Sequence, residues 1–125
     1  MSGFWFLATP YRTFPGGLDA AFDAAAEQLA VLANADIPTY SLVTQMHPAI
    51  VHGAPSPLDG GFWERFSAPV IRHAEGLIVC ELPGYEKSTG IQGEIEAFEA
   101  LGKPVVRMQP GTAPALAQRR DIPGR

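Results

Sequence analysis

Three glutamates fall within residues 90–101 of this chain, and one of them points away from the other two. An α-helix turns by about 100° per residue. The apolar side chains of a helix over this range then share one face: Ile91, Ile95, Phe98 and Leu101. Glu96 and Glu99 lie on the opposite face, as solvated charges do, whereas Glu94 points toward the apolar face. A carboxylate held there beside a cleft can act as a nucleophile or base, while one that only caps N–H groups does no chemistry, and the spacing leaves both open.

The residues just before Glu94 are suited to bind an anion. Ser88 can cap the helix with its hydroxyl group, and Gly90 and Gly93 let a ligand approach the backbone closely. The free N–H groups and the dipole of a helix N-terminus favour an anion. We therefore expect a phosphate site here, with Glu94 held ionised by the start of its own helix. An ordinary N-cap followed by glycines that ease packing would give the same pattern.

Short apolar runs and helical spacing predict the elements that must position these residues. Strands are expected over 3–9, 39–43, 76–82 and 105–108, and helices over 18–34, 62–74 and 90–101. This alternation predicts a three-layer α/β fold of the Rossmann or flavodoxin type, with a parallel sheet of four or five strands flanked by helices. Residues 44–61, with three prolines and three glycines, are expected to be irregular.

The loops after the first three strands should meet at one end of the sheet, because ligands of parallel α/β sheets bind beyond the carboxyl ends of the strands. These loops contribute candidate ligand-binding residues: Tyr11 and Arg12 from 10–17, His47 from 44–61, and Pro83 and Gly84 from 83–89. Arg12 can donate charge-assisted hydrogen bonds to an anion. A solvated arginine and a packed tyrosine are the alternatives.

Composition limits the class of protein. The chain has 125 residues, 46% of them hydrophobic and 18% charged, so we expect one domain over 1–108 and a loose Pro-rich tail over 109–125. The net charge of −4 argues against a nucleic-acid polymer as partner, although a mononucleotide needs only a few local donors. Cys80 is the only cysteine and lies in an apolar run, which predicts a buried structural thiol.

Neither a signal peptide nor an apolar run near the roughly 20 residues of a membrane span is apparent, so we expect a soluble cytoplasmic protein with no membrane contact. The spacing of His47, His52 and His73 matches no metal-binding motif. We therefore expect neither a metal nor another cofactor. His47 is instead a candidate for contact with a base or for protonation of a leaving group.

Taken together, these motifs resemble the nucleoside 2-deoxyribosyltransferase-like superfamily over roughly residues 4–106. Four parts carry the resemblance: the opening strand and loop 6–11, Phe62 and Trp63 before the middle helix, the strand 74–79, and Gly90-x-x-x-Glu94 followed by Gly102-Lys-Pro104. The last of these is the most specific. The loop 83–90 most resembles an uncharacterised branch of the superfamily.

The resemblance implies that Glu94 is the nucleophile that attacks the anomeric carbon of a nucleoside. A carboxylate below the sugar ring stabilises the positive charge that develops as the C–N bond breaks, or traps the sugar as an ester. Hydrolysis and transfer to a second base both stay open. Deoxyribosyltransferases usually carry Asp where this chain has Ser88, whereas related nucleotide N-hydrolases have Ser-x-Gly-x-x-x-Glu with the serine at the 5′-phosphate. A serine adds no charge, so a nucleoside 5′-monophosphate held at Ser88 and Gly90 is the expected ligand.

A second departure from the family concerns the proton donor. The family places an Asp in the middle helix, eight residues before the acidic residue of the next strand, and that position is Ser67 here. Ser67 can bind substrate but cannot replace a carboxyl acid, and Glu64, one turn earlier, is the candidate substitute. Two hypotheses follow: an N-glycosidic hydrolase or transferase, or a nucleotide or nucleotide-sugar sensor that has lost the acid. Oligomers are common among relatives, so we expect a homodimer or higher homo-oligomer.

Overall fold

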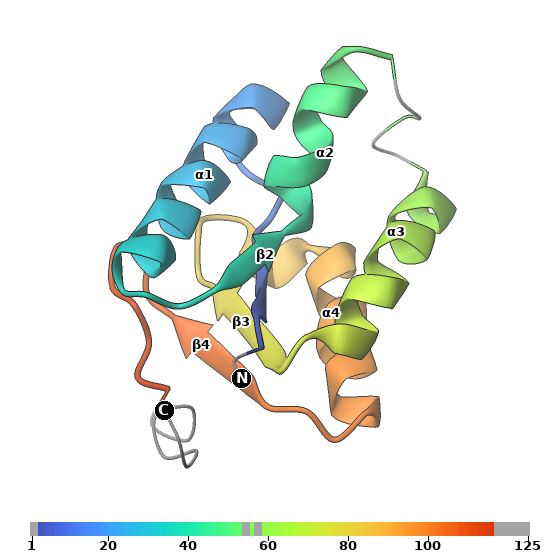
Figure 1. Ribbon diagram of the computed structural model, residues 1–125. Helices are drawn as coiled ribbons and strands as arrows, with labels where there is room; N and C mark the ends of the chain where they lie inside the picture. The colour runs from blue at the N-terminus through green and yellow to red at the C-terminus, as the bar shows by residue number, and fades with distance from the viewer. Residues whose placement is uncertain (1–2, 54–55, 57–58, 117–125) are drawn as a thin grey trace.

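The computed structural model describes residues 3–53, 56 and 59–116 of the chain. Within these residues the polypeptide alternates between strands and helices (Figure 1): β1 (Trp5–Ala8), α1 (Leu18–Asn34), β2 (Thr39–Ser41), α2 (Leu42–Val51), α3 (Gly60–His73), β3 (Gly76–Cys80), the 3₁₀-helix η1 (Tyr85–Lys87), α4 (Thr89–Ala100) and β4 (Val105–Met108). None of the helices in this part of the chain is long and apolar enough to cross a membrane.

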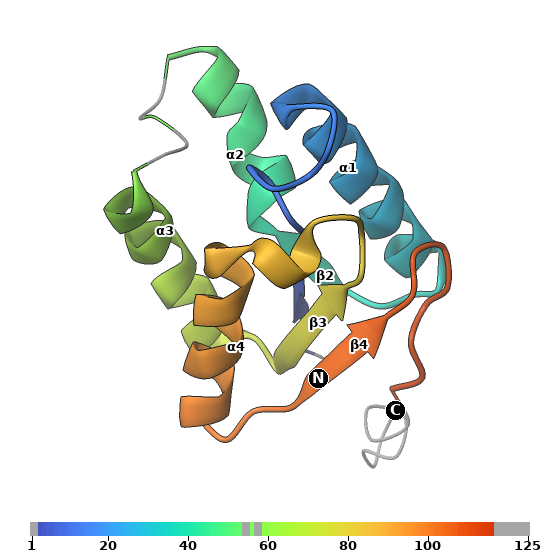
Figure 2. The same cartoon turned by 180° about the vertical axis from the view of Figure 1, so that it is seen from behind.

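The four strands form one parallel sheet in the order β2-β1-β3-β4. Phe6 in β1 lies beside Tyr40 on one side and Leu77 on the other, and Ile78 in β3 lies beside Val106 in β4. This is the strand order of flavodoxin-like sheets, in which the chain connections change face between β1 and β3. The three-layer α/β fold predicted from the sequence is confirmed, with α1 on one face of the sheet and α3 and α4 on the other (Figures 1 and 2).

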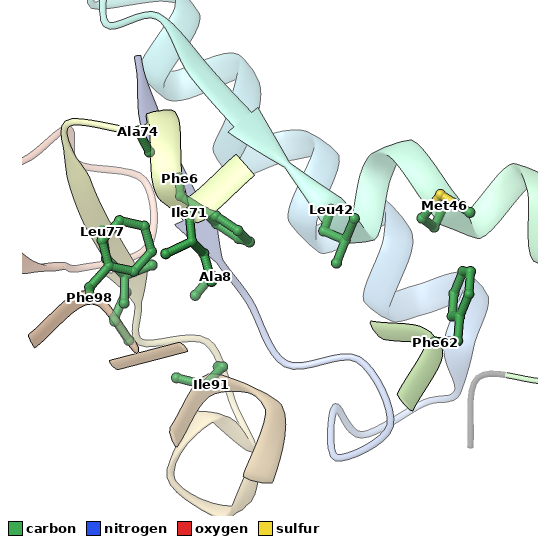
Figure 3. Close-up of a cluster of buried hydrophobic side chains, with 11 residues drawn as sticks. Phe6, Ala8, Leu42, Met46, Phe62, Ile71, Ala74, Leu77, Ile91 and Phe98 are labelled. Atoms are coloured by element: carbon green, nitrogen blue, oxygen red, sulfur yellow. The ribbon is translucent and has the colours of Figure 1, made fainter. Parts of the chain in front are cut away.

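Alternate residues of the central strands supply the two halves of the core. Trp5 and Leu7 pack with α1, and Phe6 and Ala8 pack with α2, α3 and α4, because successive side chains of a strand point to opposite faces. Figure 3 shows the second half, where the Phe6 and Phe98 rings meet edge to face with centroids 5.9 Å apart. This half of the core holds α3 and α4 against the sheet.

Residues 44–61 are not irregular throughout as predicted, because 44–51 belong to α2 and 60–61 begin α3. The hydroxyl group of Ser41 accepts a hydrogen bond from the N–H of Thr44 at 3.1 Å and so caps the helix. Leu42, Val43 and Met46 are buried on one side of it. Pro48 lies inside the helix and removes one backbone donor. The burial of the apolar side offsets that loss.

The expectation of a loose tail is wrong for residues 109–116, and residues 117–125 lie outside the part of the chain that the structure describes. The N–H of Gly111 donates a hydrogen bond to Oε1 of Gln28 in α1 at 2.8 Å. Leu116 is fully buried in the same cluster as Trp5 and Met108. Leu116, with Ala113 packed beside it, extends the core on the α1 side of the sheet.

Cys80 ends β3 and is completely buried among apolar side chains. Burial raises the pKa of its thiol to about 12, so the thiol stays protonated at neutral pH. The prediction of a buried thiol is confirmed.

Gly76 begins β3 at a point where the structure has no room for a larger residue. A Cβ atom there would lie 2.5 Å from Cζ3 of Trp5 and 2.7 Å from the backbone oxygen of Pro104. We expect Gly76→Ala to lower the free energy of unfolding by about 1–3 kcal/mol, measured by urea denaturation. Gly93→Ala is the matched control, because nothing lies within 4 Å of its added Cβ atom. It should instead raise helix stability by about 0.5–1 kcal/mol, and an equal loss in both variants would contradict this account of the packing.

Candidate functional site

A cavity of about 810 Å³ lies beside the carboxyl end of β1, between α3 and α4. It is lined by β1 and the loop after it, by the start of α2, by α3, and by the chain from Lys87 through α4. The site therefore lies between β1 and β3, where the chain connections switch from one face of the sheet to the other. Open α/β sheets bind their ligands at this point. Its volume is within the range of small-molecule sites.

Glu94 lies on the wall of this cavity, as its place on the helix predicts. Its side chain is partly exposed, yet the packing around the carboxyl group removes enough water to raise its pKa to about 8. The expectation that the start of α4 holds Glu94 ionised is therefore wrong. Glu94 is in the second turn of the helix, and burial is the cause of the rise in its pKa, with no hydrogen bond or charge of the described residues acting against it. Desolvation without compensation favours the neutral form.

The start of α4 forms one polar end of the cavity. The Ser88 hydroxyl accepts a hydrogen bond from the N–H of Ile91 at 3.1 Å, which makes it the predicted N-cap. Ser88, Thr89 and Gly90 all line the cavity, and the first N–H groups of a helix have no acceptor within the helix itself. These groups are available to an anionic ligand.

Thr9 and three cations add to the polar character of the cavity. Thr9 is buried, with 5% of its surface exposed. Within the described residues its hydroxyl oxygen has no hydrogen-bond partner. Arg12, Arg72 and Lys87 also line the cavity with exposed side chains, and none of them forms an ion pair with any carboxylate that the structure describes. Three cations against one exposed carboxylate, that of Glu64, favour an anionic ligand.

Both residues predicted on α3 line the cavity. Ser67 is buried, and its hydroxyl group donates a hydrogen bond to the backbone oxygen of Glu64 at 3.3 Å. The side chain of Glu64 is exposed. The structure therefore brings Glu64 and Ser67 to the same cavity as Glu94, and the Ser67 hydroxyl already has an acceptor.

Tyr11 lines the cavity, but His47 does not. His47 lies behind Tyr11, with its Nδ1 atom 2.6 Å from the Tyr11 hydroxyl oxygen, and it borders a separate open hollow of about 470 Å³. The expected direct contact of His47 with a ligand is therefore corrected to a contact through Tyr11. The ring of Trp63 meets that of Tyr11 with centroids 5.4 Å apart. These two rings form an aromatic part of the cavity wall.

Pro83 and Gly84 do not line the cavity, which corrects the prediction that they bind the ligand. Gly84 has φ = +93°, and an added Cβ atom would collide with the backbone oxygen of Thr13. The Thr13 hydroxyl group donates a hydrogen bond to the Gly84 backbone oxygen at 2.7 Å. The two loops thus pack on each other, and this packing positions Thr13 and Lys87 at the edge of the cavity.

Sequence reasoning missed Thr9 and Arg72. Thr9 directly follows a buried strand, so the rule that ligands bind at the carboxyl ends of parallel strands would have identified it. Arg72 is near the end of α3, and no local pattern distinguishes it from a solvated arginine. Across residues 3–53, 56 and 59–116, no group of three or more His, Cys, Asp and Glu side chains is arranged to hold a metal ion.

Comparison with known proteins places the chain in a family without assigning an activity. A search of curated proteins found no match. One family model, described as a domain of unknown function (DUF1937), matches residues 3–110, which is most of the described chain and includes every residue that lines the cavity. The chain therefore belongs to the DUF1937 family.

Proposed function

We propose that the protein cleaves or transfers the N-glycosidic bond of a nucleoside or its 5′-monophosphate, with Glu94 as the nucleophile. The observation that supports this most strongly is a desolvated carboxyl group on the wall of a nucleotide-sized cavity, at the point of the sheet where such ligands bind. The resemblance of Gly90-x-x-x-Glu94 to the nucleophile helix of the nucleoside 2-deoxyribosyltransferase-like superfamily supports the same role.

The chemistry needs Glu94 as a carboxylate. One carboxylate oxygen forms a bond to C1′ as the C1′–N bond breaks, and the leaving base takes the electron pair and a proton. Water then attacks C1′ and releases the sugar, or a second base takes its place. With a pKa of about 8 for Glu94, roughly a tenth of empty sites hold the carboxylate at pH 7. The positive charge that forms on the sugar attracts this carboxylate strongly because the surroundings exclude water.

The polar end of the cavity supports a phosphorylated substrate. The Ser88 hydroxyl group and the first N–H groups of α4 are available to a phosphate. Arg12 and Lys87 supply positive charge, and the buried Thr9 hydroxyl lacks a partner among the residues described. A 5′-phosphate at this end places the sugar toward Glu94 and the base toward the aromatic wall.

Ser88→Asp separates phosphate binding from helix capping. Aspartate is as good an N-cap as serine, so the helix is retained, but its negative charge repels a phosphate. We expect kcat/KM for a nucleoside 5′-monophosphate to fall at least about tenfold relative to kcat/KM for the matching nucleoside. Steady-state rates of base release on both substrates measure this. Equal losses on both substrates would show that Ser88 has no phosphate to bind.

A nucleotide or nucleotide-sugar sensor is the second candidate. Ser67 favours this function, because it occupies the position at which the nucleoside 2-deoxyribosyltransferase-like superfamily has its carboxyl acid. The Ser67 hydroxyl group donates a hydrogen bond to the Glu64 backbone oxygen. Incubation with a panel of nucleosides and monophosphates, followed by chromatography for free base, decides between the two functions. Base release supports the enzyme, and thermal stabilisation by a ligand without base release supports the sensor.

A homo-oligomer is part of the proposal. Phe66 in α3 and Leu101 after α4 are large apolar residues that are 46% and 52% exposed. A second copy of the chain would cover such side chains. Analytical ultracentrifugation tests the assembly, and a monomer at all concentrations would contradict it.

A further inference from the structure

Three side chains form a hydrogen-bonded line from the cavity to the surface. The hydroxyl oxygen of Tyr11 lies 2.6 Å from Nδ1 of His47, and Nε2 of His47 lies 2.8 Å from Oδ1 of Asp19. Tyr11 lines the cavity and His47 is buried, whereas 91% of the Asp19 side chain is exposed to solvent. The three residues come from the loop after β1, from α2 and from the first turn of α1. The line therefore connects the cavity wall to bulk water.

The hydrogen bonds determine where the protons lie in this line. An aspartate carboxylate only accepts hydrogen bonds, so Nε2 of His47 carries a proton. When His47 is neutral, Nδ1 accepts the Tyr11 hydroxyl proton, and when His47 is an imidazolium, Nδ1–H donates to Tyr11. The Phe22 ring stacks on His47 with centroids 4.8 Å apart, which fixes the imidazole plane. The same hydrogen bond can thus reverse its direction without movement of either ring.

Three other titratable groups lie near His47: Asp23, His52 and Tyr11. Asp23 and His52 border the same open hollow as His47, and neither is hydrogen-bonded to it in the described chain. Burial, with a smaller effect of the Asp19 charge, raises the pKa of Tyr11, so its phenol keeps its proton at rest. The phenol of Tyr11 is therefore able to donate a proton.

The proposed reaction needs such a group. Ser67 cannot give a proton to the leaving base, and the side chain of Glu64, the substitute acid expected from the sequence, is exposed to solvent. The aromatic wall of Tyr11 and Trp63 is the part of the cavity suited to the base. We propose that Tyr11 transfers the proton to the leaving base, with His47 as its proton store and Asp19 as the group that stabilises the imidazolium. This inference rests on the proposed function.

The proton balance closes over the two half-reactions. As C1′–N breaks, the electron pair goes to the base nitrogen, Tyr11 gives its proton to that nitrogen, and Nδ1–H of His47 replaces the proton on Tyr11. In the second half, water attacks C1′ and the bond between C1′ and Glu94 breaks. The water proton goes to Tyr11, and the Tyr11 proton returns to Nδ1 of His47. The two roles are those of one acid–base group in a retaining glycosidase.

Leaving-group dependence tests this role. An N7-methylated purine leaves as a neutral base without a proton, whereas an unmethylated purine needs one. We expect Tyr11→Phe to lower kcat/KM for guanosine and inosine 5′-monophosphates by about 10²–10⁴-fold and to leave kcat/KM for their N7-methyl forms within a few-fold of the wild type. Glu94→Ala should lose activity on both substrate classes. Equal losses in Tyr11→Phe on both classes would overturn the inference and leave the proposed function intact, whereas no base release by the wild-type protein from any substrate would overturn both.

Two further variants distinguish proton storage from positioning. His47→Gln should show the same selective loss as Tyr11→Phe, and Asp19→Asn a smaller selective loss. Asp23→Asn is the matched control, because its exposed carboxylate borders the same hollow without bonding to His47, and it should behave as the wild type. Long-range ¹H–¹⁵N NMR should show neutral His47 protonated at Nε2. Protonation at Nδ1 would overturn the inference without any measurement of activity.

Discussion

Glu94→Ala is expected to lower kcat/KM for base release at least about a thousand-fold, because removal of a nucleophile leaves only binding and orientation to accelerate the reaction. The loss should be in kcat, since the bond to C1′ forms only along the reaction path. Glu94→Gln should lose as much activity, because it keeps the size and polarity of the protonated side chain and lacks the carboxylate. Rates of base release on the best substrate of the panel, normalised to folded protein, measure both variants.

Glu96→Gln is the matched control for this loss. Glu96 is an exposed residue of the same helix and does not line the cavity. Glu96→Gln makes the same chemical replacement on the same helix and should keep wild-type kcat/KM. If Glu94→Gln kept more than a few per cent of the wild-type rate, Glu94 would not be the nucleophile, and another group of the cavity would have to take that role.

Glu94→Gln is also expected to stabilise the folded protein at high pH by roughly 2–4 kcal/mol. The folded carboxyl group has a pKa of about 8 and the ordinary value is 4.5. Between these values the folded state binds more protons than the unfolded state, so wild-type stability falls as pH rises. The contribution of Glu94 is fully present below pH 4.5 and is lost as pH rises through about 8. The expected stabilisation is smaller than the pKa shift multiplied by the free energy per pKa unit, because Glu94 is partly exposed and solvent screens its charge.

Urea denaturation of both proteins at several pH values measures this difference. The free energies of unfolding should be nearly equal near pH 4.5 and should diverge in favour of Glu94→Gln up to pH 9. Glu96→Gln again serves as control and should follow the wild type. Parallel pH profiles for wild type and Glu94→Gln would show that the carboxyl group is well solvated, which would remove the main support for its catalytic role.

Both predictions follow from the desolvation of the Glu94 carboxyl group. A desolvated carboxyl group costs stability once it is ionised, and the same desolvation strengthens its attraction to positive charge on a sugar. A variant that gains stability and loses activity is therefore the expected signature of a functional carboxyl group. A structural glutamate in the same helix would change stability alone.

Local patterns were sufficient for the part of the site on α4. Helical periodicity places Glu94 on the inner side of its helix, and the preference of serine for N-caps places Ser88 at its start. Both positions depend on residues within a few places in the sequence. The alternation of strands and helices likewise predicts the parallel sheet, because each connection must cross over by a helix.

Long-range contacts account for what the sequence did not predict. The three prolines and three glycines within 44–61 suggested a loop, yet burial of Leu42, Val43 and Met46 against neighbouring elements supports α2 around Pro48. His47 is hydrogen-bonded to Tyr11, 36 residues away in the sequence, and to Asp19, 28 residues away. No local pattern therefore reveals this hydrogen-bonded line. The ionisation state of Glu94 also depends on how closely the other walls approach it. Each of these features is set by tertiary packing.

Trapping of the glycosyl ester tests the central claim most directly. A fluorine at C2′ destabilises positive charge on the sugar and slows hydrolysis of an ester at C1′, so a 2′-deoxy-2′-fluoro nucleoside or nucleotide should accumulate a covalent adduct. Intact-mass and peptide mass spectrometry should place the mass of the fluorosugar on the peptide that contains Glu94, with no adduct in Glu94→Gln. Release of base without any adduct on Glu94, or an adduct on another residue, would contradict the account.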